Sequence, residues 1–412
     1  MTAVVERGPP GQPDIGYSPD FDKFKARSKR RAETEQLNPV LPEGFPKQLH
    51  SELAWDPESL AASKYDWNYV LSADNISELH RALKHFKGLN KPLGFVSQET
   101  FPLPDLHATL RDVSREVHHG RGFKVIRGIP VEEHSLEENV ILFAGISAHV
   151  APVRGRQDSQ FDGRPADVVL AHIKDLTATV DAASIGAPAY TTEKQVFHTD
   201  AGDVIALFAL QESAHGGESY LSSSYRVYNE LAKTRPDLIT TLAEPWAFDS
   251  FGKTESKYVL RPLLHRVPDD SDRLVIQYAR RAFTGYWGLP RSSDIPAITE
   301  AQAEALDAVH YTAERNAVAL HFRRGDIQFA NNLSIFHARG AFTDSPEKQR
   351  HLLRLWLRDP ENAWPTAAAL QDRWDHLYDG VTPENSVFPL VPTVRSASKG
   401  KQKDAATETA TS

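Results

Sequence analysis

The stretch KQVFHTDAGDVIALFAL, residues 194–210, decides the fold of this 412-residue chain. Its second half, VIALFAL, is a short apolar run with β-branched and aromatic residues, which is typical of a buried strand. Its first half places His198 and Asp200 two positions apart. In an extended segment such residues project to one side, with Cα atoms roughly 6.5 Å apart, and can reach one metal ion. A solvated turn often has the same composition, so the rest of the chain must supply a third ligand.

Similar strand-like runs recur downstream, and helical patterns lie before and between them. The strand-like runs occupy 257–267, 273–279, 318–322, 333–337 and 351–357. Helical patterns occupy 224–234 and 299–317, the second opening with a capping box of Thr299 and Gln302, and another helix leads into a strand at GFKVIRGI. Many antiparallel strands with added helices predict a mainly β fold, a jelly roll or cupin-like double-stranded β-helix, in preference to a doubly wound parallel sheet.

Composition removes several classes of protein. The net charge of −8 gives no basic surface for nucleic acid, and the absence of cysteine excludes thiolate chemistry and disulfides. No signal-peptide pattern and no run of about 18 apolar residues is present, so we expect a cytoplasmic protein without a membrane partner. Residues 1–35 and 393–412 are predicted to be disordered, and residues 36–392 to form one catalytic domain. The expected partner is a small molecule, and the oligomeric state stays open.

A candidate third ligand is His337, one of 17 histidines. It ends the run LSIFH on the same strand face as Leu333 and Ile335, which would point into a barrel interior. With His198 and Asp200 it would form the two-histidine, one-carboxylate facial triad that holds iron(II) and leaves positions open. Taken alone, His337 is more typical of a buried core histidine.

The segment RHLLRLWLR strengthens the metal interpretation. On a strand, Arg350, Leu352, Arg354 and Trp356 share one face, and both faces of this strand are partly apolar. A buried arginine needs an anion, either a structural ion-pair partner or a ligand. Arg350 follows His337 by 13 residues, which places a guanidinium fork well for a carboxylate that also chelates the metal.

Four motifs in order, HTD, GGES at 216–219, GDIQFANNLSIFH at 325–337 and RHLLR at 350–354, resemble the TauD/TfdA family of iron(II)- and 2-oxoglutarate-dependent dioxygenases, in a fungal-type branch with a clavaminate synthase-like fold. The resemblance covers roughly residues 95–360. It implies that His198, Asp200 and His337 hold iron(II). It also implies that Ser219 and Arg350 bind 2-oxoglutarate, and that Arg354, a further candidate for the 2-oxoglutarate site, lies nearer the substrate.

Two features depart from the family pattern. Where the family often has Trp-Asp-Asn before the distal histidine strand, this chain has Ala330, Asn331 and Asn332, so only the last residue matches. The substrate-facing position before the HxD motif is Lys194, which is either an anion-binding residue or a solvated lysine. Arg280, in RLVIQYARRAFTGYWG, is likewise a candidate substrate residue or part of a surface hairpin.

The resemblance implies a non-haem iron oxygenase that uses O2 and 2-oxoglutarate to oxidise an unactivated C–H bond, by hydroxylation, desaturation or ring closure. Because Lys194, Arg280 and Arg354 are cationic, we expect a small carboxylate-bearing molecule or amino acid, in secondary metabolism. Two alternatives stay open. One is a zinc-dependent cupin-type hydrolase that uses the same triad, and the other is a barrel that binds a small molecule without turnover.

Overall fold

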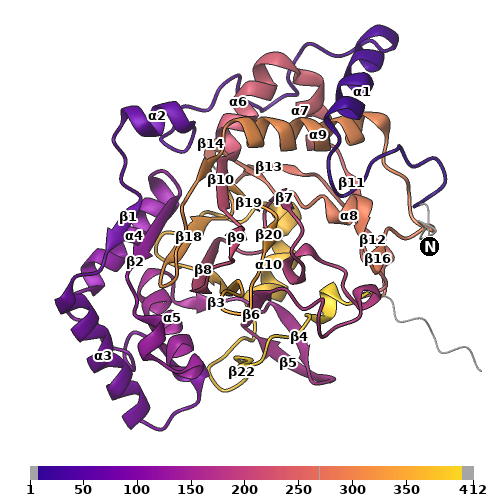
Figure 1. Cartoon of the computed structure of the whole chain (residues 1–412). Coiled ribbons are helices and arrows are strands. Elements are labelled where there is room, and N and C mark those ends of the chain that lie inside the picture. The colour runs from indigo at the N-terminus through magenta and orange to yellow at the C-terminus, as the bar shows by residue number, and fades with distance from the viewer. Residues whose placement is uncertain (1–7, 269, 401–412) are drawn as a thin grey trace, which may run out of the picture.

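Residues 8–268 and 270–400 are described by the structure, which is a computed structural model. Two β-sheets face one another at the centre, and helices cover their outer faces on opposite sides of the molecule (Figure 1). This arrangement confirms the jelly-roll, or double-stranded β-helix, prediction. None of the helices in the described ranges is long and apolar enough to cross a lipid bilayer.

The larger sheet forms one wall of the barrel. Its strands, in spatial order, are β1 (Asn68–Val70), β2 (Phe123–Arg127), β18 (Ile327–Asn331), β8 (Val204–Gln211), β21 (His351–Arg358) and β3 (Val153–Arg154), with β6 (Leu170–Lys174) also paired to β21. All pairings are antiparallel except β1 with β2. The outer face packs against α3 (Ala73–Gly88), α4 (His107–His119) and α5 (Leu136–Val150).

The smaller sheet supplies the opposite wall and the two histidines. Its order is β17 (Val318–Ala319), β10 (Ser219–Ser223), β19 (Ile335–Arg339) and β7 (Gln195–His198). Its outer face packs against α6 (Ser224–Thr234), α7 (Pro236–Ala243) and α9 (Glu300–Arg315), which lie together at the top of Figure 1. Between the two sheets, Phe123 and Ile205 of the larger sheet meet Leu221 and Ile335 of the smaller one in a buried cluster.

Short elements surround this core. The remaining helices are α1 (Phe21–Thr34), α2 (Pro57–Ala62), α8 (Arg281–Thr284) and α10 (Gln371–Tyr378). The remaining strand pairs are β9 (His215–Gly216) with β20 (Phe342–Thr343), β11 (Trp246–Asp249) with β12 (Tyr258–Arg261), β13 (Leu264–Val267) with β14 (Asp270–Ile276), and β15 (Gly285–Tyr286) with β16 (Leu289–Pro290). A three-stranded sheet joins β4 (Asp158–Phe161), β5 (Arg164–Val168) and β22 (Ser386–Val387). The strand expected at 257–267 is two strands, because Pro262 has no N–H to donate to a ladder.

The prediction that residues 1–35 are disordered is wrong for part of that range. Residues 21–34 form α1, which packs on α9. The basic residues of α1 are used in ion pairs: Arg27 Nη1 lies 2.9 Å from Asp307, and Arg31 pairs with Glu304. The high charge of this segment therefore led to a prediction of disorder, whereas in the fold the same charged residues attach α1 to α9.

The predicted C-terminal disorder is also wrong for residues 393–400. The Ser396 N–H donates to Asp158 Oδ2 at 2.5 Å, and the Gly186 N–H donates to the Ser398 carbonyl at 2.8 Å. These bonds hold the segment against the barrel in spite of its polar composition. Residues 401–412 lie outside the described ranges.

Candidate active site

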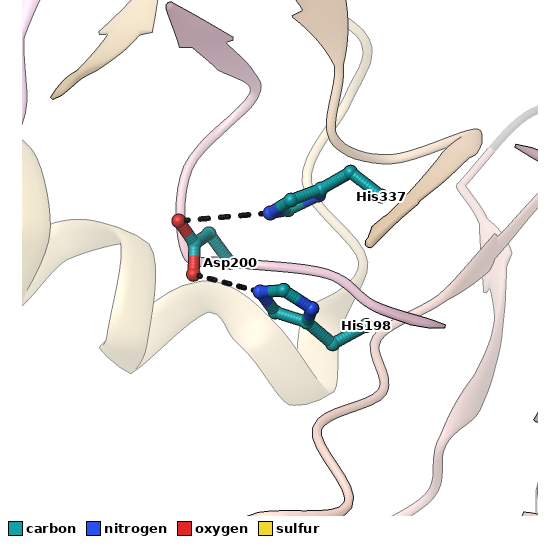
Figure 2. Close-up of side chains that lie close together, drawn as sticks. All are labelled: His198, Asp200 and His337. Carbon is teal, nitrogen blue, oxygen red and sulfur yellow. Dashed lines mark ion pairs between the residues drawn. The ribbon is translucent and has the colours of Figure 1, made fainter. Parts of the chain in front are cut away.

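Two histidines and an aspartate meet at the end of the smaller sheet. His198 is the last residue of β7 and pairs directly with His337 on the neighbouring strand β19, while Asp200 lies in the loop that follows β7. His198 Nε2 lies 3.7 Å from Asp200 Oδ1, and His337 Nε2 lies 3.9 Å from Asp200 Oδ2 (Figure 2). One ligand atom from each residue lies within 4.8 Å of the others, a spacing that suits a single metal ion.

Both imidazoles are in the form that a metal needs. The Nδ1 of His198 is 2.9 Å from the Val196 carbonyl, so Nδ1–H donates to that oxygen and Nε2 keeps its lone pair toward Asp200. Gln195 Nε2 lies 3.0 Å from the same Nε2 and can donate to it. Burial lowers the pKa of His198, and it lowers the pKa of His337 to about 3. Both rings are therefore neutral near pH 7.

Asp200 is held as a charged carboxylate by β21. Arg354 Nη1 donates to its Oδ2 at 2.7 Å, and Trp356 Nε1 donates to the same oxygen at 3.1 Å. Burial alone would raise the pKa of Asp200, but the nearby charge of Arg354 outweighs it, so the pKa lies below its ordinary value. Two donors on Oδ2 leave Oδ1 as the oxygen nearer His198.

A cavity of about 680 Å³ opens beside this cluster. Its wall includes His198, Asp200, Arg354 and Trp356. Tyr17, from the N-terminal segment, also lines it and packs edge-on against Tyr286 with ring centroids 4.9 Å apart. The volume is in the range of small-molecule sites.

The side chains of β21 alternate between the interior and the helix-covered face of the barrel, as predicted. Leu352 and Trp356 pack in clusters on the inner face, whereas Leu353, Leu355 and Leu357 pack in the cluster beneath α3, α4 and α5. Arg354 points inward to Asp200. The inner face of β21 therefore carries the arginines toward the barrel interior.

Arg350, on the same face, lies beside the GGES motif. A Cβ on Gly217 would lie 3.1 Å from Cδ and Nε of Arg350, so a glycine is what lets the guanidinium approach. Phe342 contacts the Arg350 guanidinium at 5.5 Å and that of Arg339 at 4.8 Å from its ring centroid. Arg350 lines a separate cavity of about 270 Å³, and Ser219 Oγ donates to Gln328 Oε1 at 2.8 Å.

The family described as "Taurine catabolism dioxygenase TauD, TfdA family" matches residues 89–356. The chain belongs to this family. Taurine hydroxylase-like protein SAT17 of Stachybotrys chartarum is 36% identical over 338 residues, which cover 80% of this chain and 85% of that protein. FR-33289 synthase of Streptomyces rubellomurinus is 26% identical over 320 residues, covering 75% and 90%. The chain is therefore a TauD/TfdA dioxygenase, and the matches give no support to the hydrolase or the non-catalytic barrel.

Solved structures share the TauD/TfdA fold with this chain. An asparagine oxygenase in complex with Fe(II), hydroxyasparagine and succinate superposes with a TM-score of 0.54 at 13% identity, covering 74% of this chain and all of that one. The non-haem iron oxygenase OrfP in complex with Fe and α-ketoglutaric acid gives 0.52 at 16% identity, covering 71% and 93%. At such identities the likeness concerns the fold.

Sequence reasoning missed the residues that fix the loop of the family's HxD motif. Asn332 Oδ1 accepts from the Asp200 N–H at 2.8 Å, and its Nδ2 donates to the carbonyls of Asp200 and Gly202 at 2.9 and 2.8 Å. Gln277 Nε2 donates to the Asp200 carbonyl at 2.8 Å. Asn332 could have been found as the one residue that matches the family's Trp-Asp-Asn pattern. Gln277 left no signal in the sequence.

Two predicted substrate residues of the TauD/TfdA site are used elsewhere. Lys194 lies on the surface, 49% exposed, and pairs with Glu314 at 2.7 Å, so the structure does not bring it to the cavity. Arg280 lines the cavity but is 1% exposed, and its Nη2 lies 2.7 Å from Asp307 Oδ1. This ion pair anchors α9 to the segment after β14, and the substrate role of Arg280 stays a prediction.

Proposed function

We propose that this dioxygenase uses iron(II) and 2-oxoglutarate to oxidise a C–H bond of a small anionic molecule, and that His198, Asp200 and His337 hold the iron. The observation that carries the proposal is the geometry of these three side chains. Their candidate ligand atoms lie within 4.8 Å of one another, in a barrel that belongs to a dioxygenase family. Structures with the same fold contain Fe with α-ketoglutaric acid or succinate, which supports the same cofactor set here.

The chemistry of the donors fits iron(II). Two neutral imidazoles and one carboxylate on the same side of an ion are the donors of a facial triad, which leaves the remaining positions for other ligands. Bound iron would supply the activation of O2 coupled to decarboxylation of 2-oxoglutarate to succinate. Arg354 and Trp356 orient Asp200 for this role, and the Val196 carbonyl fixes the tautomer of His198.

Arg350 is the best candidate to bind the distal carboxylate of 2-oxoglutarate. Its side chain is 5% exposed, and within the described ranges no carboxylate lies within 4.0 Å of its guanidinium. Burial and the nearby charge of Arg339 lower its pKa to about 9, so the site favours an anion that restores the balance. Arg350 lies in a cavity separate from that of Asp200, and a five-carbon dicarboxylate is a co-substrate that would link the two. Ser219, which lies on β10 opposite Arg339 of β19, is proposed to line the same route.

The substrate proposal rests on the cavity beside Asp200. Its walls carry guanidinium groups, which favour an anionic guest over a neutral one. Asparagine and arginine derivatives occur in the solved relatives, which supports a small, charged substrate such as an amino acid. Arg354 stays a candidate to contact the substrate as well as Asp200.

An anaerobic optical titration tests the proposed function. Iron(II) and 2-oxoglutarate together should give a weak visible charge-transfer band in the wild-type protein, and zinc should give none. His198→Ala, Asp200→Ala and His337→Ala should each abolish the band and the iron-dependent release of succinate. His376→Ala is a matched control, because His376 lines the same cavity but is not part of the cluster. A full band in any triad variant would contradict that ligand's assignment.

A further inference from the structure

Four arginines from separate segments line the cavity beside Asp200. Arg354 belongs to β21, Arg281 begins α8, Arg373 lies in α10, and Arg395 precedes the last described turn. Each is close enough to Asp200 to be coupled to it electrostatically. The iron site is therefore adjoined by a strongly positive wall.

Of these four, only Arg354 has a carboxylate partner within ion-pair distance in the described ranges. Arg281 Nη1 donates to the Gly186 carbonyl at 2.6 Å, and Arg395 Nη1 donates to the Gln157 carbonyl at 3.1 Å. Carbonyl oxygens satisfy hydrogen-bond donors but do not neutralise a charge. Arg373 is exposed within the cavity. Three guanidinium groups thus keep their charge available to a guest.

The charges of the wall do not cancel. Its carboxylates are Asp200, which is bound by Arg354, and Asp158, which accepts from the Ser396 N–H at 2.5 Å. Four guanidinium groups against two carboxylates leave two positive charges, and Lys253 and Lys399 also line the wall. Of the other arginines on the wall, Arg156 pairs with Asp167, and Arg280 shares Asp307 with Arg27. Bound iron(II) and 2-oxoglutarate would cancel one another, so the excess would persist in the loaded enzyme.

Two buried guanidinium N–H donors on this wall have no acceptor among the described residues. Arg354 Nη2 and Arg395 Nε are both buried without a hydrogen-bond acceptor, and the Arg354 side chain is only 4% exposed. Trp356 holds the two arginines together, since its ring centroid lies 4.8 Å from the Arg354 guanidinium and 5.2 Å from that of Arg395. Buried donors without acceptors are costly unless a ligand supplies the acceptors.

We propose that Arg281, Arg373 and Arg395 form a subsite for a doubly charged phosphoryl-type group on the substrate, such as a phosphonate or phosphate monoester. This inference rests on the proposed function, because it places the group beside the proposed iron site. A guest with two negative charges offsets more of the wall's positive charge than a guest with one, and a head group with three oxygens can accept from guanidinium groups of three separate segments. A planar carboxylate with one charge does neither.

The subsite is built partly outside the region that the family shares. Arg373 and Arg395 follow residue 356, where the family match ends. Tyr190 contributes by accepting from the Arg395 N–H through its hydroxyl at 3.2 Å. The C-terminal segment therefore determines the head-group preference of this chain, while the shared barrel supplies the proposed iron and 2-oxoglutarate sites.

Binding of three molecules with one carbon skeleton tests the subsite. We would titrate 2-aminoethylphosphonate, taurine and β-alanine calorimetrically into the full chain, once with iron(II) and 2-oxoglutarate under anaerobic conditions and once without them. The phosphonate should bind at least about tenfold more tightly than the sulfonate and the carboxylate at pH 8, because it alone carries two charges there. Equal affinities, tighter binding of taurine, or no phosphonate binding at millimolar concentration would overturn the proposal.

Substitutions test which arginines cause the preference for the phosphonate. Arg281→Gln, Arg373→Gln and Arg395→Gln should each reduce the advantage of the phosphonate, whereas Arg324→Gln, a 42% exposed arginine paired with Glu132, should not. Arg373 is exposed in the cavity, so its variant tests the charge even if another variant fails to fold. A phosphonate preference that survives in Arg373→Gln would remove that residue from the subsite. The optical band of iron(II) with 2-oxoglutarate reports separately on the proposed function.

Discussion

Arg354 donates from Nη1 to Oδ2 of Asp200 across 2.7 Å, and so ties β21 of the larger sheet to the loop that follows β7 of the smaller one. The same arginine donates from Nε to Gln157 Oε1 at 2.8 Å, which fixes its plane. Because both ends are held, the carboxylate of Asp200 is oriented before any ligand arrives. A charged donor that fixes the orientation of a carboxylate raises the affinity of that carboxylate for a metal ion.

The first prediction follows from this contact. Arg354→Gln should weaken iron(II) binding by about 10- to 100-fold, because Asp200 loses the donor that holds its Oδ2. Titration of iron(II) under anaerobic conditions measures the change. Arg358→Gln is the matched control on the same strand, since Arg358 pairs with Asp203 at 3.4 Å and not with Asp200. Unchanged iron affinity in Arg354→Gln would show that Trp356 and the loop orient the carboxylate without Arg354.

A second prediction concerns the glycine beside Arg350. Gly217→Ala should raise the apparent KM for 2-oxoglutarate, because the new Cβ would lie 2.9 Å from Ser213 Oγ and 3.1 Å from Cδ and Nε of Arg350, and so displace the guanidinium. The φ angle of +76° adds backbone strain, so a control with the same strain is needed. Gly163→Ala provides it, since Gly163 has φ +75° and nothing within 4 Å of its added Cβ. Equal KM changes in both variants would point to strain and away from Arg350.

Asn332 gives a third prediction. Asn332→Ala should lower the free energy of unfolding by about 2–4 kcal/mol, since it removes three hydrogen bonds from a buried side chain to the 200–202 loop. Iron(II) affinity should fall with it, because the loop carries Asp200. Urea unfolding and iron titration measure the two effects. Asn385→Ala, at an exposed turn, is the control. A stable variant with normal iron affinity would show that Gln277 alone holds the loop.

Local patterns predicted the barrel and the triad well. The capping box of Thr299 and Gln302 begins α9 where expected, and alternation along 350–357 placed Arg354 on the interior face. The pairing of His337 with His198 follows from both lying at strand positions that face the interior. Such features depend on neighbours a few residues apart, which a sequence displays directly.

Contacts between distant segments were not predictable. The sequence offered Arg280 as a candidate substrate residue or part of a surface hairpin because only its charge was visible, while its partner Asp307 lies 27 positions later in a helix. Tyr17 and Arg395 come from segments whose polar composition indicated disorder, yet both line the cavity. Composition describes the average cost of ordering a segment, whereas one buried anchor such as Ser396 on Asp158 can offset that cost.

The fourth prediction is acid sensitivity through His310. Burial, with the charges of Arg280 and Lys194, lowers the pKa of His310 to about 3, whereas an unfolded histidine titrates near 6.5. The unfolded chain therefore binds the extra proton first, and this stability is present above about pH 6.5 and lost as pH falls toward 3. His310→Phe should reduce the loss of unfolding free energy between pH 7 and pH 5 by at most about 2 kcal/mol. Urea unfolding at both pH values measures it, and an identical loss in the variant would contradict the assignment.

The last prediction separates Arg280 from Lys194, the two cations that the sequence placed together. Arg280→Gln should lower the free energy of unfolding by about 1.5–3 kcal/mol, because it removes a buried charge-assisted hydrogen bond while Asp307 keeps its contact with Arg27. Lys194→Gln should cost about 0–1 kcal/mol, since its pair with Glu314 is nearly half exposed on both sides. Lys194→Gln should also keep the wild-type KM for substrate. Chemical unfolding and steady-state kinetics compare the variants directly, and a raised KM in Lys194→Gln at unchanged stability would return that lysine to the substrate site.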